Sequence, residues 1–202
     1  MKKMSRVAFA ALAGLLALPV AAEDKKAGAP AMPNQEEMMK AWMEVATPGK
    51  PHEMLAKSAG NWTTKTKSWM VPGKPPEETE GTAEMKMVLG GRFLDQHVKG
   101  TMMGQPFEGM GQTGYDNYKK RYVSTWMDTA GTTIMMMTGT WNEAKKSCTM
   151  TGMVDDPAFK KAIKVSSVTK MIDDDHQVFE MYSPGPDGKP MKVVEVTYTR
   201  KK

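Results

Sequence analysis

The chain has 202 residues, of which 40% are hydrophobic, 25% charged and 7% aromatic. This length accommodates one ordinary domain with its own core and leaves no room for two large domains. The composition excludes collagen-like, coiled-coil and wholly disordered proteins.

The first 22 residues have the pattern of a cleaved secretory signal. A basic segment over 2–6 precedes an uncharged apolar stretch over 7–20, and Ala21-Ala22 places small side chains at the expected cleavage point. The apolar stretch is too short to span a bilayer as a stable helix. We therefore expect a periplasmic or secreted protein, cleaved after Ala22, without a transmembrane anchor in the mature chain.

Cleavage would change the charge of the protein. It removes three basic residues and no acidic one, so the formal net charge falls from +5 to +2 and a nucleic-acid partner is not expected. Cys148 is the single cysteine, so no internal disulfide can form even in an oxidising compartment. We interpret this residue as a buried, unreactive thiol.

Residues 23–33 lack periodicity and predict a flexible lead-in, whereas residues 34–59 predict a helical segment. Asn34 and Glu37 have the spacing of a capping box, so a first helix is expected from there to the stop at 47–49. A second short helix is expected from Pro51 to Gly60.

From residue 60 to residue 202, apolar and polar residues alternate with period two, which predicts a β domain. The alternation is clearest over 79–89. Short turns between strands require antiparallel neighbours, and so long a run must close or fold into two layers. We favour an all-β, antiparallel up-and-down barrel of about ten strands, which has no exposed edge and can hold a small ligand. The expected strands cover 61–71, 79–89, 92–103, 106–115, 120–128, 132–141, 147–154, 160–172, 176–183 and 189–200.

Both ends of the β domain resemble calycins, the lipocalins and their relatives. Gly60-Asn61-Trp62 places a G-x-W at the start of the first strand, and Arg200 lies near the end of the last. In calycins this Trp packs at the closed barrel end beneath the Arg, an arrangement that a guanidinium stacked on an indole stabilises. The resemblance implies a lipocalin-like barrel closed by Gly60, Trp62 and Arg200.

The chain also resembles the bacterial family named domain of unknown function 1579, over about Met54 to Arg200. This resemblance implies a compact, lipocalin-like β domain and brings no established reaction or catalytic residue. The motifs that carry it are Gly60-Asn61-Trp62, Leu89-Gly90-Gly91-Arg92-Phe93, Gly111-Gln112-Thr113-Gly114-Tyr115-Asp116, Trp126-Met127-Asp128 and Tyr198-Thr199-Arg200.

Methionine is unusually frequent, because 20 of the 22 methionines lie beyond residue 22. Met85 and Met87, like Met135 and Met137, put two thioethers on one strand face. Such residues fill an adaptable core or line an apolar cavity. Alternatively they form a Cu(I) site, although His97 would have to come from another strand.

No nucleophile turn, phosphate-binding loop or metal-ligand spacing is present, so we assign no catalytic residue, metal ligand or cofactor. Our first hypothesis is a non-enzymatic binder of a small apolar or amphipathic ligand. The alternatives are a filled barrel that acts as an interaction or envelope module, and an enzyme that uses Glu180, Glu195, His97 or Tyr115 as a lumenal acid or base. The pattern does not show which strand face is inside, and it leaves the oligomeric state open. The candidate lumen residues are Met85, Met87, Phe107, Tyr115, Trp126, Met135, Met137, Glu180 and Tyr182.

Overall fold

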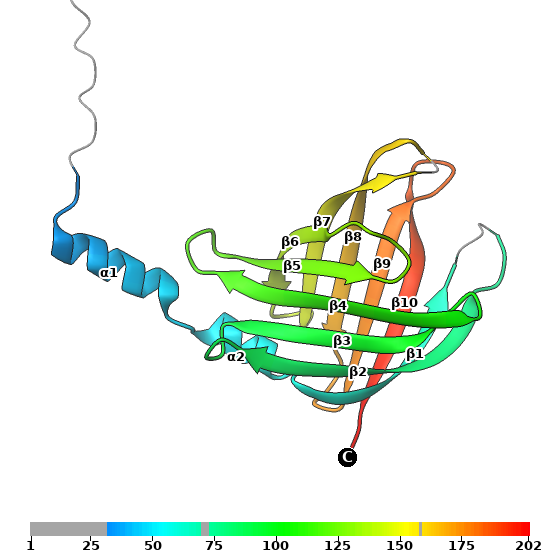
Figure 1. Ribbon diagram of the computed structural model, residues 1–202, viewed down its shortest axis with the longest axis horizontal. Helices are drawn as coiled ribbons and strands as arrows, with labels where there is room; N and C mark the ends of the chain where they lie inside the picture. The colour runs from blue at the N-terminus through cyan, green and yellow to red at the C-terminus, as the bar shows by residue number, and fades with distance from the viewer. Residues whose placement is uncertain (1–31, 70–72, 158) are drawn as a thin grey trace, which may run out of the picture.

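The computed structural model describes residues 32–69, 73–157 and 159–202. Within these ranges two helices, α1 (Gln35–Ala46) and α2 (Lys50–Ala56), precede ten strands (Figure 1). The expected secretory signal over 1–22 and the lead-in up to residue 31 lie outside the described residues. The strands are β1 (Gly60–Ser68), β2 (Glu77–Val88), β3 (Phe93–Met102), β4 (Gln105–Asp116), β5 (Arg121–Asp128), β6 (Met135–Asn142), β7 (Ser147–Asp156), β8 (Lys161–Met171), β9 (His176–Pro184) and β10 (Pro190–Arg200).

The ten strands form one closed antiparallel barrel, in which each strand pairs with its neighbours in the chain and β1 pairs with β10. Along this seam Trp62 lies opposite Arg200 and Ser68 lies opposite Val194. The structure therefore confirms the predicted up-and-down barrel. Closure pairs the backbone of both terminal strands and leaves no free sheet edge.

The hairpin between β3 and β4 shows how the sequence makes these tight connections. Met103 and Gly104 have φ values of 51° and 72°, both in the left-handed region. A two-residue hairpin turn needs such values because its twist then matches that of the strands, and glycine adopts them without steric cost.

Helix α1 begins at the predicted capping box. The Asn34 side chain accepts a hydrogen bond from Glu37 N at 2.9 Å, and the Glu37 carboxylate accepts one from Asn34 N at 3.0 Å. None of its residues is buried, and the helix projects away from the barrel (Figure 1). The Asn117 side chain ties the C-terminal end of α1 to the turn after β4 by donating to the carbonyls of Val45 and Thr47 at 3.0 and 2.8 Å.

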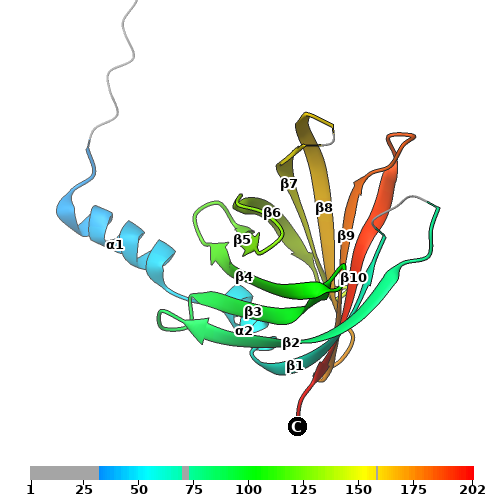
Figure 2. The same ribbon diagram turned by 45° about the vertical axis from the view of Figure 1, so that its right-hand side comes forward.

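Helix α2 lies across one end of the barrel, against β2, β3 and β4 (Figure 2). His52 is buried and caps the helix, because its Nδ1 accepts a hydrogen bond from Gly49 N at 3.0 Å. Leu55 packs against both groups of buried apolar residues in the barrel. We call the end of the barrel beneath α2 the closed end. The first group contains Trp62, Ala83, Met85, Leu94 and Tyr198, and the second contains Tyr122, Met137, Met150, Ile163 and Val165.

Candidate functional site

A cavity of about 170 Å³ lies inside the barrel beneath α2, and we call it the deep cavity. Met54, Leu55 and Ser58 close it from the helical side, and every strand except β1 contributes to its wall. Six methionines line the deep cavity: Met54, Met85, Met135, Met137, Met150 and Met171.

A second cavity of about 360 Å³, the outer cavity, lies further along the lumen, toward the end opposite α2. Thr64, Thr66 and Ser68 of β1 line it on one side, and Phe107 of β4 lines it on the other. The two cavities are neighbouring parts of one lumen, because the same five residues line both. These residues are Gln96, Trp126, Met135, Phe179 and Tyr198.

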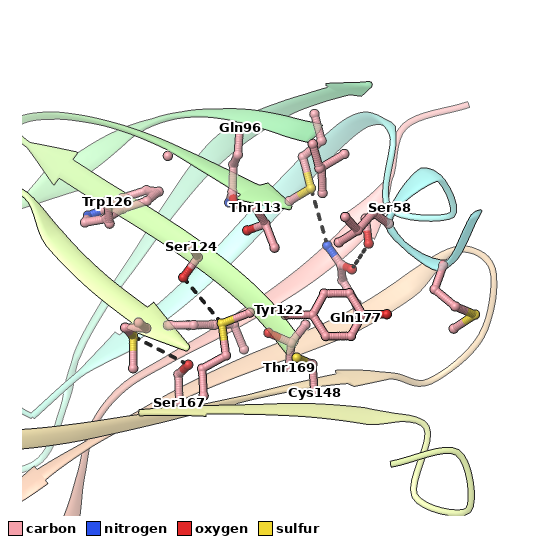
Figure 3. Close-up of a pocket in the computed structure, with 18 of the residues that line it drawn as sticks. Ser58, Gln96, Thr113, Tyr122, Ser124, Trp126, Cys148, Ser167, Thr169 and Gln177 are labelled. Atoms are coloured by element: carbon pink, nitrogen blue, oxygen red, sulfur yellow. Dashed lines mark hydrogen bonds between the residues drawn. The ribbon is translucent and has the colours of Figure 1, made fainter. Parts of the chain in front are cut away.

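Hydroxyl and amide groups inside the lumen donate to methionine sulfurs (Figure 3). Ser124 Oγ lies 3.3 Å from the Met150 sulfur, and Ser167 Oγ lies 3.8 Å from the Met137 sulfur. Thioether sulfur is a weak acceptor, so these bonds satisfy the donors poorly. The donors therefore remain available to a stronger acceptor that enters the lumen.

Gln177 is a further polar residue of the lumen and lies nearer the closed end than Ser124 and Ser167. Its Nε2 donates to the Met85 sulfur at 3.7 Å, and its Oε1 accepts from Ser58 Oγ at 3.1 Å. On the opposite wall Gln96 Nε2 donates to the Tyr198 hydroxyl at 3.2 Å. Two carboxamides thus face the same interior from β9 and β3 (Figure 3).

Glycines on β4 make room for the Trp126 indole. A Cβ on Gly109 would collide with the six-membered part of this ring, and one on Gly111 would meet Trp126 Cε3 at 2.9 Å and the Thr125 carbonyl oxygen. The indole Nε1 donates to the Asp128 carboxylate at 2.7 Å, which fixes the ring between the two cavities. Glycine at positions 109 and 111 therefore permits the close packing of the indole against β4.

No charged side chain is among the described residues that line the deep cavity. Burial raises the pKa of Tyr198 to about 12, although its hydrogen bond with Gln96 acts in the opposite direction. Burial is also the main reason that the pKa of Tyr122 is raised to about 12. Burial raises the pKa of Cys148 to about 11, so this thiol remains protonated near neutral pH. The deep cavity is therefore polar in places but uncharged, whereas the residues that line the outer cavity include Glu77, Glu80, Lys99 and Asp128.

Trp62 and Arg200 form the predicted closure of the barrel. Trp62 is fully buried, and the Arg200 guanidinium carbon lies 4.1 Å from the centre of its ring. The indole Nε1 donates to the Ser58 carbonyl at 3.0 Å. Gly60 has a φ of 139°, and a Cβ there would collide with Arg200 Nη1, so this position requires glycine.

The structure brings most of the candidate lumen residues together. Met85, Trp126, Met135 and Met137 line the deep cavity, and Phe107 lines the outer cavity. Two further candidates lie at the closed end without lining either cavity. Met87 packs against the Trp62 group, and Tyr115 stacks edge-on against Tyr122, with ring centres 5.0 Å apart.

Glu180 and Tyr182 lie on the outer face of the barrel, which corrects their inclusion among the lumen candidates. Period two along β9 explains their position, because Phe179 and Met181 face the lumen and their neighbours therefore face outward. Glu180 accepts from Lys170 Nζ at 2.8 Å and pairs with Lys192 Nζ at 2.5 Å. Burial alone would raise the Glu180 pKa, but the two lysines outweigh it and lower this pKa to about 2.

The other candidate acids and bases also lie away from the lumen. Glu195 is opposite Glu180 on β10 and pairs with Lys192 Nζ at 2.6 Å. His97 is on the outer face of β3 and bonds the Asp95 carboxylate at 3.0 Å. Among the described residues, no cluster of three His, Cys, Asp or Glu side chains is placed to hold a metal ion.

Sequence reasoning missed the polar lining of the lumen. The period-two pattern assigns Gln96, Ser124, Ser167 and Gln177 to strands but does not mark them as interior residues. Their alternation with outward residues would have identified them once Trp62 fixed the inward face of β1 and the strand register was known. The register depends on pairing across strands and is not visible in one sequence.

The fold and the site define a closed, ten-strand antiparallel barrel with a thioether-rich lumen whose deep cavity is uncharged. The model of the family described as "Protein of unknown function (DUF1579)" matches residues 47–200, and the chain belongs to this family. Helix α1 ends immediately before the matched region. The comparison with curated proteins gave no match.

Solved structures similar to this chain include a natural barrel and designed ones. Rv2717c from M. tuberculosis is 15% identical with a TM-score of 0.53, and the match covers 77% of this chain and 100% of that one. A de novo designed fluorescence-activating β-barrel is 15% identical with a TM-score of 0.40, covering 71% of this chain and 93% of the design. The likeness to Rv2717c supports the fold alone.

No helix within the described ranges is long and apolar enough to cross a membrane.

Proposed function

We propose that this protein is an exported, non-enzymatic carrier or sensor that binds a small, uncharged, apolar or amphipathic molecule in its lumen. The observation that carries the proposal is the pair of neighbouring cavities, of about 170 and 360 Å³. Together they reach the size of small-molecule sites, which occupy roughly 300–1,000 Å³. The amino-terminal signal pattern of the sequence supports export.

The chemistry of the wall indicates the class of ligand. Methionine side chains are unbranched and polarizable, so six of them adapt to ligands of different shape. The deep cavity has no charged group to pair with a carboxylate or an ammonium, and burying an unpaired ion there would be costly. The ligand is therefore neutral in the part that enters the deep cavity.

The hydrogen-bond donors of the lumen add a polar requirement. Ser124, Ser167 and Gln177 donate to sulfurs, and exchanging such a weak acceptor for a carbonyl or hydroxyl oxygen is favourable. A ligand with an apolar body and one or two oxygen acceptors fits this arrangement better than a pure hydrocarbon.

The alternatives receive less support. A filled barrel that acts only through its surface would not have two interior cavities. For an enzyme, the sequence suggested four groups as a lumenal acid or base. Glu180, Glu195 and His97 are outside the barrel, and Tyr115 lines neither cavity.

The binding test uses Nile red, a neutral dye whose fluorescence rises in apolar surroundings. Thr169→Phe adds a ring to the deep cavity, while Thr151→Phe adds the same ring to the exposed outer face of β7. Thr169→Phe should weaken dye binding at least tenfold, and Thr151→Phe should leave it unchanged. Trp42→Ser in α1 serves as a second control, because Trp42 is 71% exposed and offers the dye a surface site.

Equal dye affinity in wild-type protein and in folded Thr169→Phe would overturn the proposal, and so would the loss of binding in Trp42→Ser alone. Native mass spectrometry of protein purified from its own host is the complementary measurement. We expect one neutral small molecule per chain, absent from the Thr169→Phe variant.

A further inference from the structure

A row of soft metal ligands crosses three strands on the outer face of the barrel. His97 of β3 lies directly opposite Met110 of β4, and Met110 lies directly opposite Met127 of β5. Side chains at directly paired positions have Cβ atoms about 4.5–5.5 Å apart. One imidazole and two thioethers are thus continuous neighbours, although they are far apart in the sequence.

The three side chains are open to solvent. The His97 side chain is 44% exposed, and Met110 and Met127 are 40% and 37% exposed. All three line a groove of about 470 Å³, which residues 131–134 border on the β6 side. An ion can therefore reach them from outside. Methionines that served only to fill the core would be buried, as Met85 and Met137 are.

The histidine is oriented by a carboxylate. Asp95 lies two residues earlier on β3, and its Oδ2 is 3.0 Å from His97 Nε2. Gln112 Nε2 donates to the other Asp95 oxygen at 3.2 Å, so the carboxylate is itself held in place. Metal-binding histidines commonly use one ring nitrogen in such a bond, which leaves the other free for the metal.

We propose that His97, Met110 and Met127 form a surface site for Cu(I), with Asp95 as a positioning residue. Thioethers favour this soft, monovalent ion, and imidazole is also a suitable ligand for copper. The row lies between a polar row that contains Asp95 and Gln112 and one in which Lys99 pairs with Glu108 at 3.3 Å.

This site differs from the methionine pairs considered in the sequence. Met85, Met135 and Met137 face the lumen, where they have no imidazole beside them among the residues that line the deep cavity. On the outer face, by contrast, a histidine and methionines from different strands do lie side by side. His97 comes from β3, and the two methionines come from β4 and β5. The site is independent of lumenal ligand binding.

The test is an anaerobic Cu(I) titration of the full chain in competition with a chromophoric chelator. Wild-type protein should bind one equivalent with submicromolar affinity. The double variant Met110→Leu, Met127→Leu retains apolar side chains of similar volume and should bind at least tenfold more weakly. Its matched control is Met136→Leu, Met153→Leu, which changes two exposed methionines on the same outer wall and should leave the affinity unchanged.

Two further measurements separate ligation from a structural effect. Asp95→Asn should lower Cu(I) affinity by about 10- to 100-fold, with the urea midpoint of the apo protein preserved. X-ray absorption of the Cu(I) complex should show both sulfur and nitrogen neighbours. Wild-type affinity weaker than micromolar, unchanged affinity in the Met110→Leu, Met127→Leu variant, or a sulfur-only spectrum would each overturn the proposal.

Discussion

Replacing Arg200 by alanine should markedly destabilise the barrel. The guanidinium donates through Nη1 to the Ala59 carbonyl at 2.6 Å, through Nη2 to Lys57 O at 2.8 Å and through Nε to Asp174 O at 2.9 Å. Its carbon also lies 4.1 Å from the centre of the Trp62 ring. One side chain therefore joins β10 to the segment before β1 and to the turn before β9.

The expected cost follows from these contacts. A cation–π contact with a buried indole contributes about 1–2 kcal/mol, and the half-buried bond to Ala59 contributes about 2 kcal/mol because its donor is charged. The carbonyls of Lys57 and Asp174 are exposed and regain water, so their bonds add little. We expect Arg200→Ala to lower the free energy of unfolding by about 3–4 kcal/mol, and Arg200→Lys, which keeps the charge but loses the planar fork, by about 2 kcal/mol.

Urea denaturation followed by Trp fluorescence measures this loss. With an m value of about 2–3 kcal/mol/M for a chain of this size, the midpoint of Arg200→Ala should fall by about 1–2 M. Lys201→Ala is the control, because this exposed residue is tied to β1 through its backbone N, which donates to Asn61 O at 2.8 Å. A loss below about 1 kcal/mol in Arg200→Ala, or an Arg200→Lys variant as stable as wild type, would refute the reasoning.

Three other residues allow separate predictions. Gly139→Ala should cost about 2 kcal/mol in urea denaturation, because the new Cβ would collide with the Thr149 carbonyl oxygen across the β6–β7 pair. The Glu180 pKa is lowered to about 2, so its ion pairs contribute fully above the unfolded pKa near 4.5. Stability should fall by about 1–2 kcal/mol as the pH drops from 4.5 to 2, and Glu180→Gln should remove this dependence. At pH 8, Cys148 should react with iodoacetamide at least tenfold more slowly in folded than in urea-unfolded protein, since burial raises its pKa to about 11.

For each of these three predictions, one experimental outcome would contradict the reasoning. Gly131→Ala is the control for Gly139→Ala, because a Cβ on Gly131 meets no atom within 4 Å, and equal stability of the two variants would contradict the steric argument. A pH profile that is identical in Glu180→Gln and wild type would show that other carboxylates dominate acid unfolding. Equal alkylation rates in folded and unfolded protein would show that Cys148 is accessible.

The number and type of strands were predictable because the alternation of apolar and polar residues is local. Along 79–89 each inward residue, such as Ala83 and Met85, is followed by an outward one, and the structure has a strand there. The interval around 132–134 was less predictable. Thr132, Thr133 and Ile134 have strand propensity, but β6 begins only at Met135, and Ile134 remains 62% exposed beside the outer groove.

The face of each strand was harder to assign than the strand itself. On β9 both faces carry large side chains, and Glu180 is only 7% exposed although it faces outward, because two lysines cover it. Composition alone therefore does not distinguish this outward ion cluster from an interior acid. Conversely, Gln96 and Gln177 are polar and lie inside, where each has partners supplied by other strands.

The seam of the barrel has a consequence for folding. Trp62 and Arg200 pair across β1 and β10, so closure joins strands that are almost the whole domain apart in the chain. Such a contact must overcome a large loop-closure entropy, and folds rich in long-range pairings fold slowly. During synthesis β1 has no partner on one side until β10 has left the ribosome. Until then the first strand of the barrel remains an open edge on which another chain could add.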